Sequence, residues 1–122
     1  MAESCACSAA PKLIFACSGA ADVGEVSDRA ARQLTRAGVG KMYCLAGIGG
    51  DIPGILEQTG LASALLAIDG CPTGCVSASL KRAGFRNFTT LQLADLGLNK
   101  GTSPASAENI ERVVTAAREQ FQ

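Results

Sequence analysis

Residues 65–75 read Leu-Leu-Ala-Ile-Asp-Gly-Cys-Pro-Thr-Gly-Cys, and this stretch decides the fold. The aliphatic run over 65–68 predicts a buried strand, and the spacing of apolar residues after Pro72 predicts a helix over about 72–83. Cys71 and Cys75 then stand at i and i+4 on one face of the first helical turn, where the helix dipole favours thiolate over thiol. Two thiolates on one face indicate a soft-metal or redox site.

Three further strand-and-helix units surround this stretch. The other apolar segments predict strands over 12–16, 41–46 and 88–94, and the other helices are expected to begin near Asp22, Pro53 and Ser103. Asp22 has capping-box spacing to Glu25. In the last helix, five apolar residues share one face: Ile110, Val113, Val114, Ala117 and Phe121.

Four strands that alternate with four helices place the chain in the α/β class. The pattern predicts a four-stranded parallel sheet in a three-layer α/β/α, Rossmann-like architecture, with the flavodoxin-like strand order 2-1-3-4. We expect a single domain over 12–122. Residues 1–11, which contain Cys5 and Cys7 among small residues, are predicted to be a flexible N-terminal arm.

Composition excludes several classes of function. Lys plus Arg and Asp plus Glu balance at 11 each, and the aromatic residues are four Phe and one Tyr, so the sequence predicts no nucleic-acid binding. No segment has the pattern of a signal peptide or the length of a membrane span, which predicts a cytoplasmic protein without a membrane partner.

The chain has six cysteines and no histidine. A domain of this size needs no disulfides for stability, and in a reducing compartment cysteines are more often metal ligands or catalytic thiols. The absence of histidine excludes Cys–His and Ser–His–Asp nucleophiles and any imidazole ligand. Thiolate is therefore the main chemistry available.

The carboxyl ends of parallel strands meet at one edge of a sheet, and ligand sites form there at the point where the strand order reverses. Cys17 ends the first strand, Cys44 lies near the end of the second, and Cys71 and Cys75 follow the third. These four thiols predict a zinc site, with an iron–sulfur cluster or copper(I) as alternatives. The alternative without a ligand is that these cysteines serve only as small buried hydrophobic residues. Cys5 and Cys7 are candidates for additional metal ligands.

Neighbouring residues have two interpretations each. Asp69, with Gly70, either orients the loop that carries the metal ligands, without binding the metal itself, or caps the helix that follows. Residues 47–50 are glycine-rich, but no Walker lysine follows, so we expect a turn close to the thiol site rather than a phosphate cradle. Asp51 is expected to cap the next helix, with an acid or metal ligand as the alternative.

The residues also resemble a known family. The tripeptide Asp69-Gly70-Cys71 with Cys75, preceded by the segments Cys17–Ala20 and Cys44–Gly50, resembles the DGC-domain family of zinc-binding proteins from about Lys12 to the final helix. This resemblance implies a small prokaryotic protein without an established activity. It also implies that the family's four characteristic cysteines, as zinc ligands, are Cys17, Cys44, Cys71 and Cys75.

Two functions from different classes follow. The first is a metal-binding protein, not an enzyme, that serves in metal sensing, storage or delivery. The second is a thiol–disulfide or sulfur-handling enzyme in which Cys71 attacks the substrate and Cys75 or Cys17 resolves the intermediate. A metal ion is the one partner that the sequence indicates. It identifies no protein partner and leaves a homodimer open.

Overall fold

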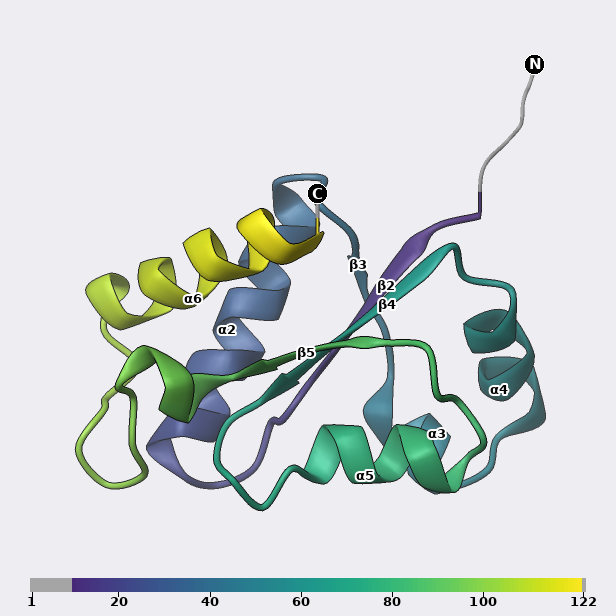
Figure 1. The fold of residues 1–122 in the computed structure, drawn as a ribbon, viewed down its shortest axis with the longest axis horizontal. Helices are drawn as coiled ribbons and strands as arrows, with labels where there is room; N and C mark the ends of the chain where they lie inside the picture. Colours follow the sequence, from purple (N-terminus) through teal and green to yellow (C-terminus); the bar gives the residue numbers. More distant parts are fainter. Residues whose placement is uncertain (1–9, 122) are drawn as a thin grey trace.

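The computed structural model describes residues 10–121, which form a four-stranded parallel sheet between two layers of helices (Figure 1). The strands are β2 (Lys12–Ala16), β3 (Lys41–Met42), β4 (Ala64–Asp69) and β5 (Thr89–Gln92). Their order is β3-β2-β4-β5, and all three pairings are parallel. The predicted order 2-1-3-4 is therefore confirmed.

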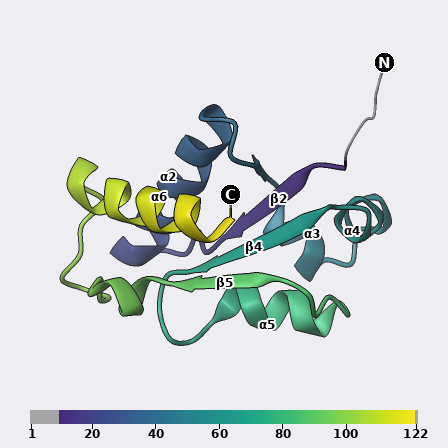
Figure 2. The same ribbon diagram turned by 45° about the horizontal axis from the view of Figure 1, so that its top comes forward.

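The helices divide between the two faces of the sheet. In Figures 1 and 2, two helices lie side by side on one face, α2 (Asp22–Arg36) and α6 (Ala107–Phe121). The opposite face carries α3 (Leu45–Gly49), α4 (Pro53–Gly60) and α5 (Cys75–Arg82). A 3-10 helix, η1 (Leu93–Leu96), follows β5 directly. The predicted α/β/α layering is confirmed.

Both faces of the central strands are buried, which explains why their sequences do not alternate between apolar and polar residues. Along β2, Ile14 and Ala16 pack against the cluster beneath α2 and α6. Leu13 and Phe15 point the other way and pack with residues of α3 and α5. The direction in which a side chain points at the end of β2 therefore decides which helical layer it meets.

The predicted apolar face of the last helix is confirmed. All five residues assigned to that face are buried, and they pack in one cluster with α2: Ile110, Val113, Val114, Ala117 and Phe121. The helix begins at Ala107 rather than at Ser103. The Ser103 hydroxyl instead accepts the backbone N–H of Asn99 at 2.8 Å, so it closes the preceding loop and does not cap the helix.

Two strands are shorter than predicted. The second ends at Met42 instead of residue 46, because Cys44 is already the N-cap of α3 and its sulfur accepts the Gly47 N–H at 3.3 Å. The fourth, β5, ends at Gln92, and the apolar residues after it form η1. In both places the chain continues past the strand into a short helix that buries only part of its length, Gly47 and Ile48 in α3 and Leu93 in η1.

The predicted capping box at Asp22 is wrong. Ala21 is the N-cap of α2 and makes no side-chain cap. The Asp22 carboxylate instead accepts the backbone N–H of Gly101 at 2.9 Å and that of Ser103 at 3.0 Å, which ties the loop before α6 to the start of α2. These hydrogen bonds, first that of Gly101, hold the pKa of Asp22 below its ordinary value of 3.8.

The glycine-rich segment is a helix and not a turn. Gly47 lies inside α3, where a Cβ atom would come within 2.1 Å of Ile55 Cδ1, so the missing side chain lets α3 contact α4 closely. Asp51 does not cap α4, whose N-cap is Ile52. Asp51 has a φ of 56° and its carboxylate pairs with Arg82 of α5 at 3.0 Å.

The predicted N-terminal arm falls almost wholly on residues 1–9, outside the described residues. Within the described part, the Pro11 carbonyl accepts the N–H of Ser63 at 3.0 Å, just before β2 and β4 begin. No helix between residues 10 and 121 combines the length and the hydropathy needed to cross a membrane.

Candidate functional site

Each of the four cysteines in the described residues follows a strand end at the carboxyl edge of the sheet. Cys17 comes directly after β2, and Cys44 follows β3 and caps α3. Cys71 lies two residues beyond the end of β4, and Cys75 is the first residue of α5. All four are free thiols. The parallel topology thus brings sequence-distant cysteines to one edge.

The thiols do not all face the same way at this edge. Cys17 is half-buried and packs with the cluster on the α3 and α5 side of the sheet. Cys71 is also half-buried, but it packs with the cluster on the α2 and α6 side. Cys44 and Cys75 are exposed. The four sulfur atoms are therefore distributed over both sides of the sheet.

This distribution bears on the predicted zinc site. Within residues 10–121, no group of three or more Cys, Asp or Glu side chains lies close enough together to hold one metal ion. The donor chemistry suits a soft metal, whereas the geometry is not that of a closed tetrahedral site. The assignment of four ligands remains a prediction. Cys5 and Cys7 lie outside the described residues.

The segment between β4 and α5 differs from its prediction. The helix begins at Cys75, with Gly74 as its N-cap at a φ of 69°. Cys71 precedes the helix in a turn that is closed by a hydrogen bond from Gly74 N–H to the Cys71 carbonyl at 3.0 Å. The expectation that both thiols lie on one face of the first helical turn is therefore wrong. The left-handed conformation, which glycine adopts at little cost, separates them.

Asp69 holds the start of α5. Its carboxylate is 1% exposed and accepts the Val76 N–H at 2.8 Å and the Ser77 hydroxyl at 2.5 Å. Gly74 has no side chain with which to cap the helix, so the carboxylate from the end of β4 takes that role. The prediction that Asp69 caps the helix is confirmed, and its role in orienting a loop of metal ligands stays a prediction.

Gly70 allows the turn after β4 to approach α2 closely, and its predicted place in a ligand loop stays a prediction. A Cβ atom at this position would lie 3.0 Å from the Val23 carbonyl oxygen at the start of α2. The turn that carries Cys71 therefore passes directly against that helix.

The Cys71 thiol is shifted toward its thiolate form. Hydrogen bonding from Thr73, through its side chain and its backbone, lowers the pKa of Cys71 below the ordinary 9.0, and the positive charge of Lys100 acts in the same direction. Burial and the Asp69 carboxylate oppose this shift. Cys71 is consequently suited to metal ligation or nucleophilic attack, since both need the thiolate.

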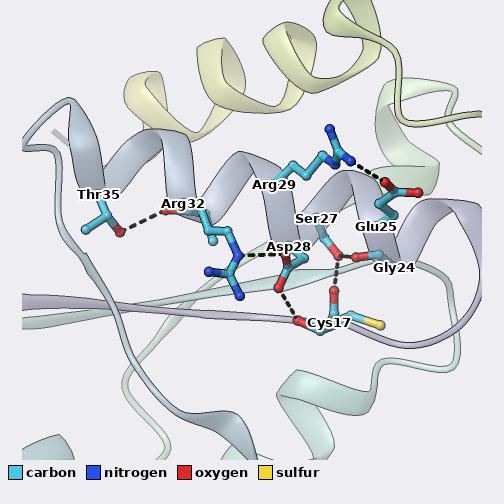
Figure 3. A network of polar contacts seen from close by, with 10 residues as sticks. Cys17, Gly24, Glu25, Ser27, Asp28, Arg29, Arg32 and Thr35 are labelled. Carbon is cyan, nitrogen blue, oxygen red and sulfur yellow. Dashed lines mark hydrogen bonds and ion pairs between the residues drawn. The ribbon is translucent and has the colours of Figure 1, made fainter.

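A polar network beneath α2 fixes the backbone at Cys17 (Figure 3). The Ser27 hydroxyl donates to the Gly24 carbonyl at 3.0 Å and to the Cys17 carbonyl, while the Cys17 sulfur lies to the side of this network. Gly24 is required here, because a Cβ atom would lie 2.4 Å from the Gly19 carbonyl oxygen. The loop that carries Cys17 is thus clamped against the first turns of the helix.

The same helix carries an arrangement that the sequence analysis missed. The half-buried Asp28 carboxylate accepts the Ser18 hydroxyl and the Arg32 Nε–H, both at 2.8 Å. The bond from Arg32, followed by that from Ser18, holds the pKa of Asp28 below its ordinary value. The i,i+4 spacing of Arg32 from Asp28 on a predicted helix was a usable signal for this pair.

Comparison with known proteins identifies the family. A family model described as the DGC domain matches residues 13–117, which is most of the chain. The chain belongs to the DGC-domain family. The anaerobic and virulence modulator AnvM of Pseudomonas aeruginosa is 38% identical over 88 residues, which cover 72% of this chain and 67% of AnvM. No solved structure matches the chain.

This DGC domain also has a cleft that the sequence did not indicate. It has a volume of about 960 Å³ and lies between α2 and the segment that joins β3 to α3. Cys44 lines it, whereas the other three described cysteines do not. The segment after the two-residue β3 contributes Tyr43, Cys44, Leu45 and Ala46 to its lining, where the sequence predicted a continuing strand.

Proposed function

We propose that this DGC domain is a thiol-based regulatory protein that binds a soft metal ion, in the first place zinc, through cysteines at the carboxyl edge of the sheet. The observation that carries the proposal is that four strand ends or helix starts at this edge each present a free cysteine. The lowered pKa of Cys71 supports it, because a metal ligand must be a thiolate.

The distribution of the thiols favours an exchangeable site over a structural one. Since no three donors are gathered among residues 10–121, metal binding has to draw the cysteine-bearing loops together. Part of the binding free energy is then used for that rearrangement, which weakens the net affinity. Such a site suits metal sensing or delivery. An iron–sulfur cluster or copper(I) would use the same donors.

The relative supports a regulatory role. The name of AnvM describes an anaerobic and virulence modulator, which is a regulatory description and not that of an enzyme. We carry only this general role over to the present chain. Thiolates respond both to metal supply and to oxidants, so the cysteine-rich edge provides a chemical basis for regulation.

Elemental analysis and a zinc competition titration test the proposal. The reduced full chain, purified without added metal, is titrated with zinc against a chromophoric chelator, in parallel with Cys71→Ser and Cys75→Ser. We expect one ion per chain. Each variant should lose more zinc affinity than the roughly ten- to hundred-fold loss that follows when a residue hydrogen-bonded to a metal ligand is changed. Ala78→Ser, on the exposed surface of α5, is the matched control and should bind like the parent chain.

Two results would contradict the proposal. One is a reduced chain that binds no stoichiometric zinc, copper(I) or iron. The other is a zinc affinity that Cys71→Ser leaves unchanged. A brown protein with visible absorption would change the assigned cofactor from zinc to an iron–sulfur cluster, with the same cysteines as ligands.

The pKa of Cys71 also favours a second candidate, a thiol–disulfide enzyme. The Cys71 thiolate would attack a substrate disulfide and form a mixed disulfide with release of one substrate thiolate. Cys75, four residues later, would then displace the second thiolate, leaving an oxidised Cys71–Cys75 pair and a reduced substrate. Peptide mapping of that disulfide in metal-free protein separates this candidate from the first.

A further inference from the structure

The cleft beside β3 has the features of a ligand site. Its floor includes Ala16 at the end of β2, and its apolar wall includes Met42 and Leu45. Strand β3 pairs with β2 only through Lys41 and Met42, and the last backbone bond between them runs from Tyr43 N–H to the Ile14 carbonyl. The edge of β2 beyond that bond is therefore open toward the cleft.

The helical wall of the cleft is positively charged. Arg32 and Arg36 stand one turn apart on α2, and both line the cleft together with Asp28. Asp28 is already engaged by the Ser18 hydroxyl and by Arg32 Nε. Among the described residues Arg36 forms no ion pair. Two guanidinium groups against one carboxylate leave a net positive charge, and a guanidinium binds a carboxylate in a planar, two-bond geometry.

A nucleophile lies in the same cleft. Cys44 lines it as an exposed thiol, and its sulfur is held by the Gly47 N–H at 3.3 Å. The remaining described cysteines lie elsewhere: Cys17 and Cys71 are half-buried in the two cores, and Cys75 is exposed at the start of α5. Only Cys44, among these four, shares a cavity with unengaged guanidinium donors.

We propose that this cleft binds small organic disulfides that carry carboxylates, with a carboxylate on Arg32 and Arg36 and one sulfur presented to Cys44. The Cys44 thiolate attacks that sulfur, a Cys44 mixed disulfide forms, and the original disulfide bond breaks. The leaving thiolate takes the electron pair and is protonated by solvent. Cys44 is oxidised and half of the ligand is reduced, so no other oxidant is needed. A thiol reverses the reaction.

This inference does not rest on metal binding, and its test is run in the presence of a chelator. The reduced full chain is treated separately with oxidised glutathione, which is anionic, with the neutral bis(hydroxyethyl) disulfide and with the cationic cystamine. Mass spectrometry of proteolytic peptides gives the rate of modification at each cysteine. Cys75 is the internal control, because it is an exposed thiol outside the cleft.

We expect the ratio of the glutathione rate to the cystamine rate to be at least about ten-fold higher at Cys44 than at Cys75. Arg36→Gln should lower the ratio at Cys44 several-fold and leave that at Cys75 unchanged. Arg29→Gln is the matched control, because Arg29 lies on the same helix but pairs with Glu25 at 2.8 Å and does not line the cleft.

Equal ratios at Cys44 and Cys75 would overturn the proposal, and so would equal effects of Arg36→Gln and Arg29→Gln. A second measurement needs no variant. Raising the salt concentration to about 1 M shortens the screening length to roughly 3 Å and should lower the ratio at Cys44 toward that at Cys75. A ratio at Cys44 that does not respond to salt would equally refute the role of the arginines.

Discussion

Replacing Asp69 by alanine tests whether this carboxylate holds the start of α5. Asp69 is 1% exposed and accepts the Val76 N–H at 2.8 Å and the Ser77 hydroxyl at 2.5 Å. The N-cap residue itself, Gly74, provides no side-chain hydrogen bond. We therefore expect Asp69→Ala to destabilise the domain by loosening the turn between β4 and α5.

The magnitude follows from the groups that lose their partner. Val76 is fully buried, and a buried N–H left without an acceptor costs about 1–3 kcal/mol. The Ser77 hydroxyl contributes less, because Thr90 Oγ1 lies 3.5 Å away and can replace the lost acceptor. We expect a decrease of about 2 kcal/mol in the free energy of unfolding.

Asp69→Asn is the matched control. Its side-chain oxygen can still accept the Val76 N–H, so we expect it to cost about 1 kcal/mol or less. Urea unfolding followed by circular dichroism gives both values, provided that the denaturant slope is the same in all three proteins. A cost below about 0.5 kcal/mol for Asp69→Ala would refute the assignment of Asp69 as the cap, since surface changes alone lie in that range.

The asparagine variant also reports on Cys71. The Asp69 carboxylate raises the pKa of this thiol by charge repulsion with the thiolate, so its removal should lower the pKa further. The pH dependence of alkylation at Cys71 should shift to lower pH in Asp69→Asn. A shift to higher pH would mean that the interaction between the two side chains is not repulsive.

Three other predictions concern separate contacts. Because the folded pKa of Asp22 lies below 3.8, its carboxylate contributes stability above that pH and loses it as the pH falls through the folded pKa, so Asp22→Asn should flatten the acid side of the stability profile measured by urea unfolding. Gly47→Ala should cost about 1–3 kcal/mol by forcing α3 away from α4, whereas Gly49→Ala, with open space at its Cβ position, should not destabilise the domain. Thr73→Val should raise the pKa of Cys71, seen as slower alkylation at neutral pH, and an unchanged rate would contradict the role of the Thr73 hydroxyl.

The alternation of apolar strands with helical patterns was sufficient to predict the layers and the strand order, because right-handed connections and two buried sheet faces leave few other arrangements. It was also sufficient to bring Cys17, Cys44, Cys71 and Cys75 to one edge, since the carboxyl ends of parallel strands always meet there. The tripeptide at residues 69–71 indicated the family that the match over residues 13–117 then showed.

Tertiary structure decided how those thiols face. Cys17 continues the alternation of β2 and packs on the α3 and α5 side with Leu13 and Phe15. Cys71 lies in the turn after β4 and packs on the α2 and α6 side, opposite to the side that the alternation of Leu65 and Ala67 along β4 would give it. The left-handed Gly74 set the start of α5, and the segment that follows the two-residue β3 lines the cleft at Cys44. The sequence pattern thus determined the fold, with the stretch over 65–75 as its central unit, whereas the use of the cysteines depends on packing between segments far apart in the sequence.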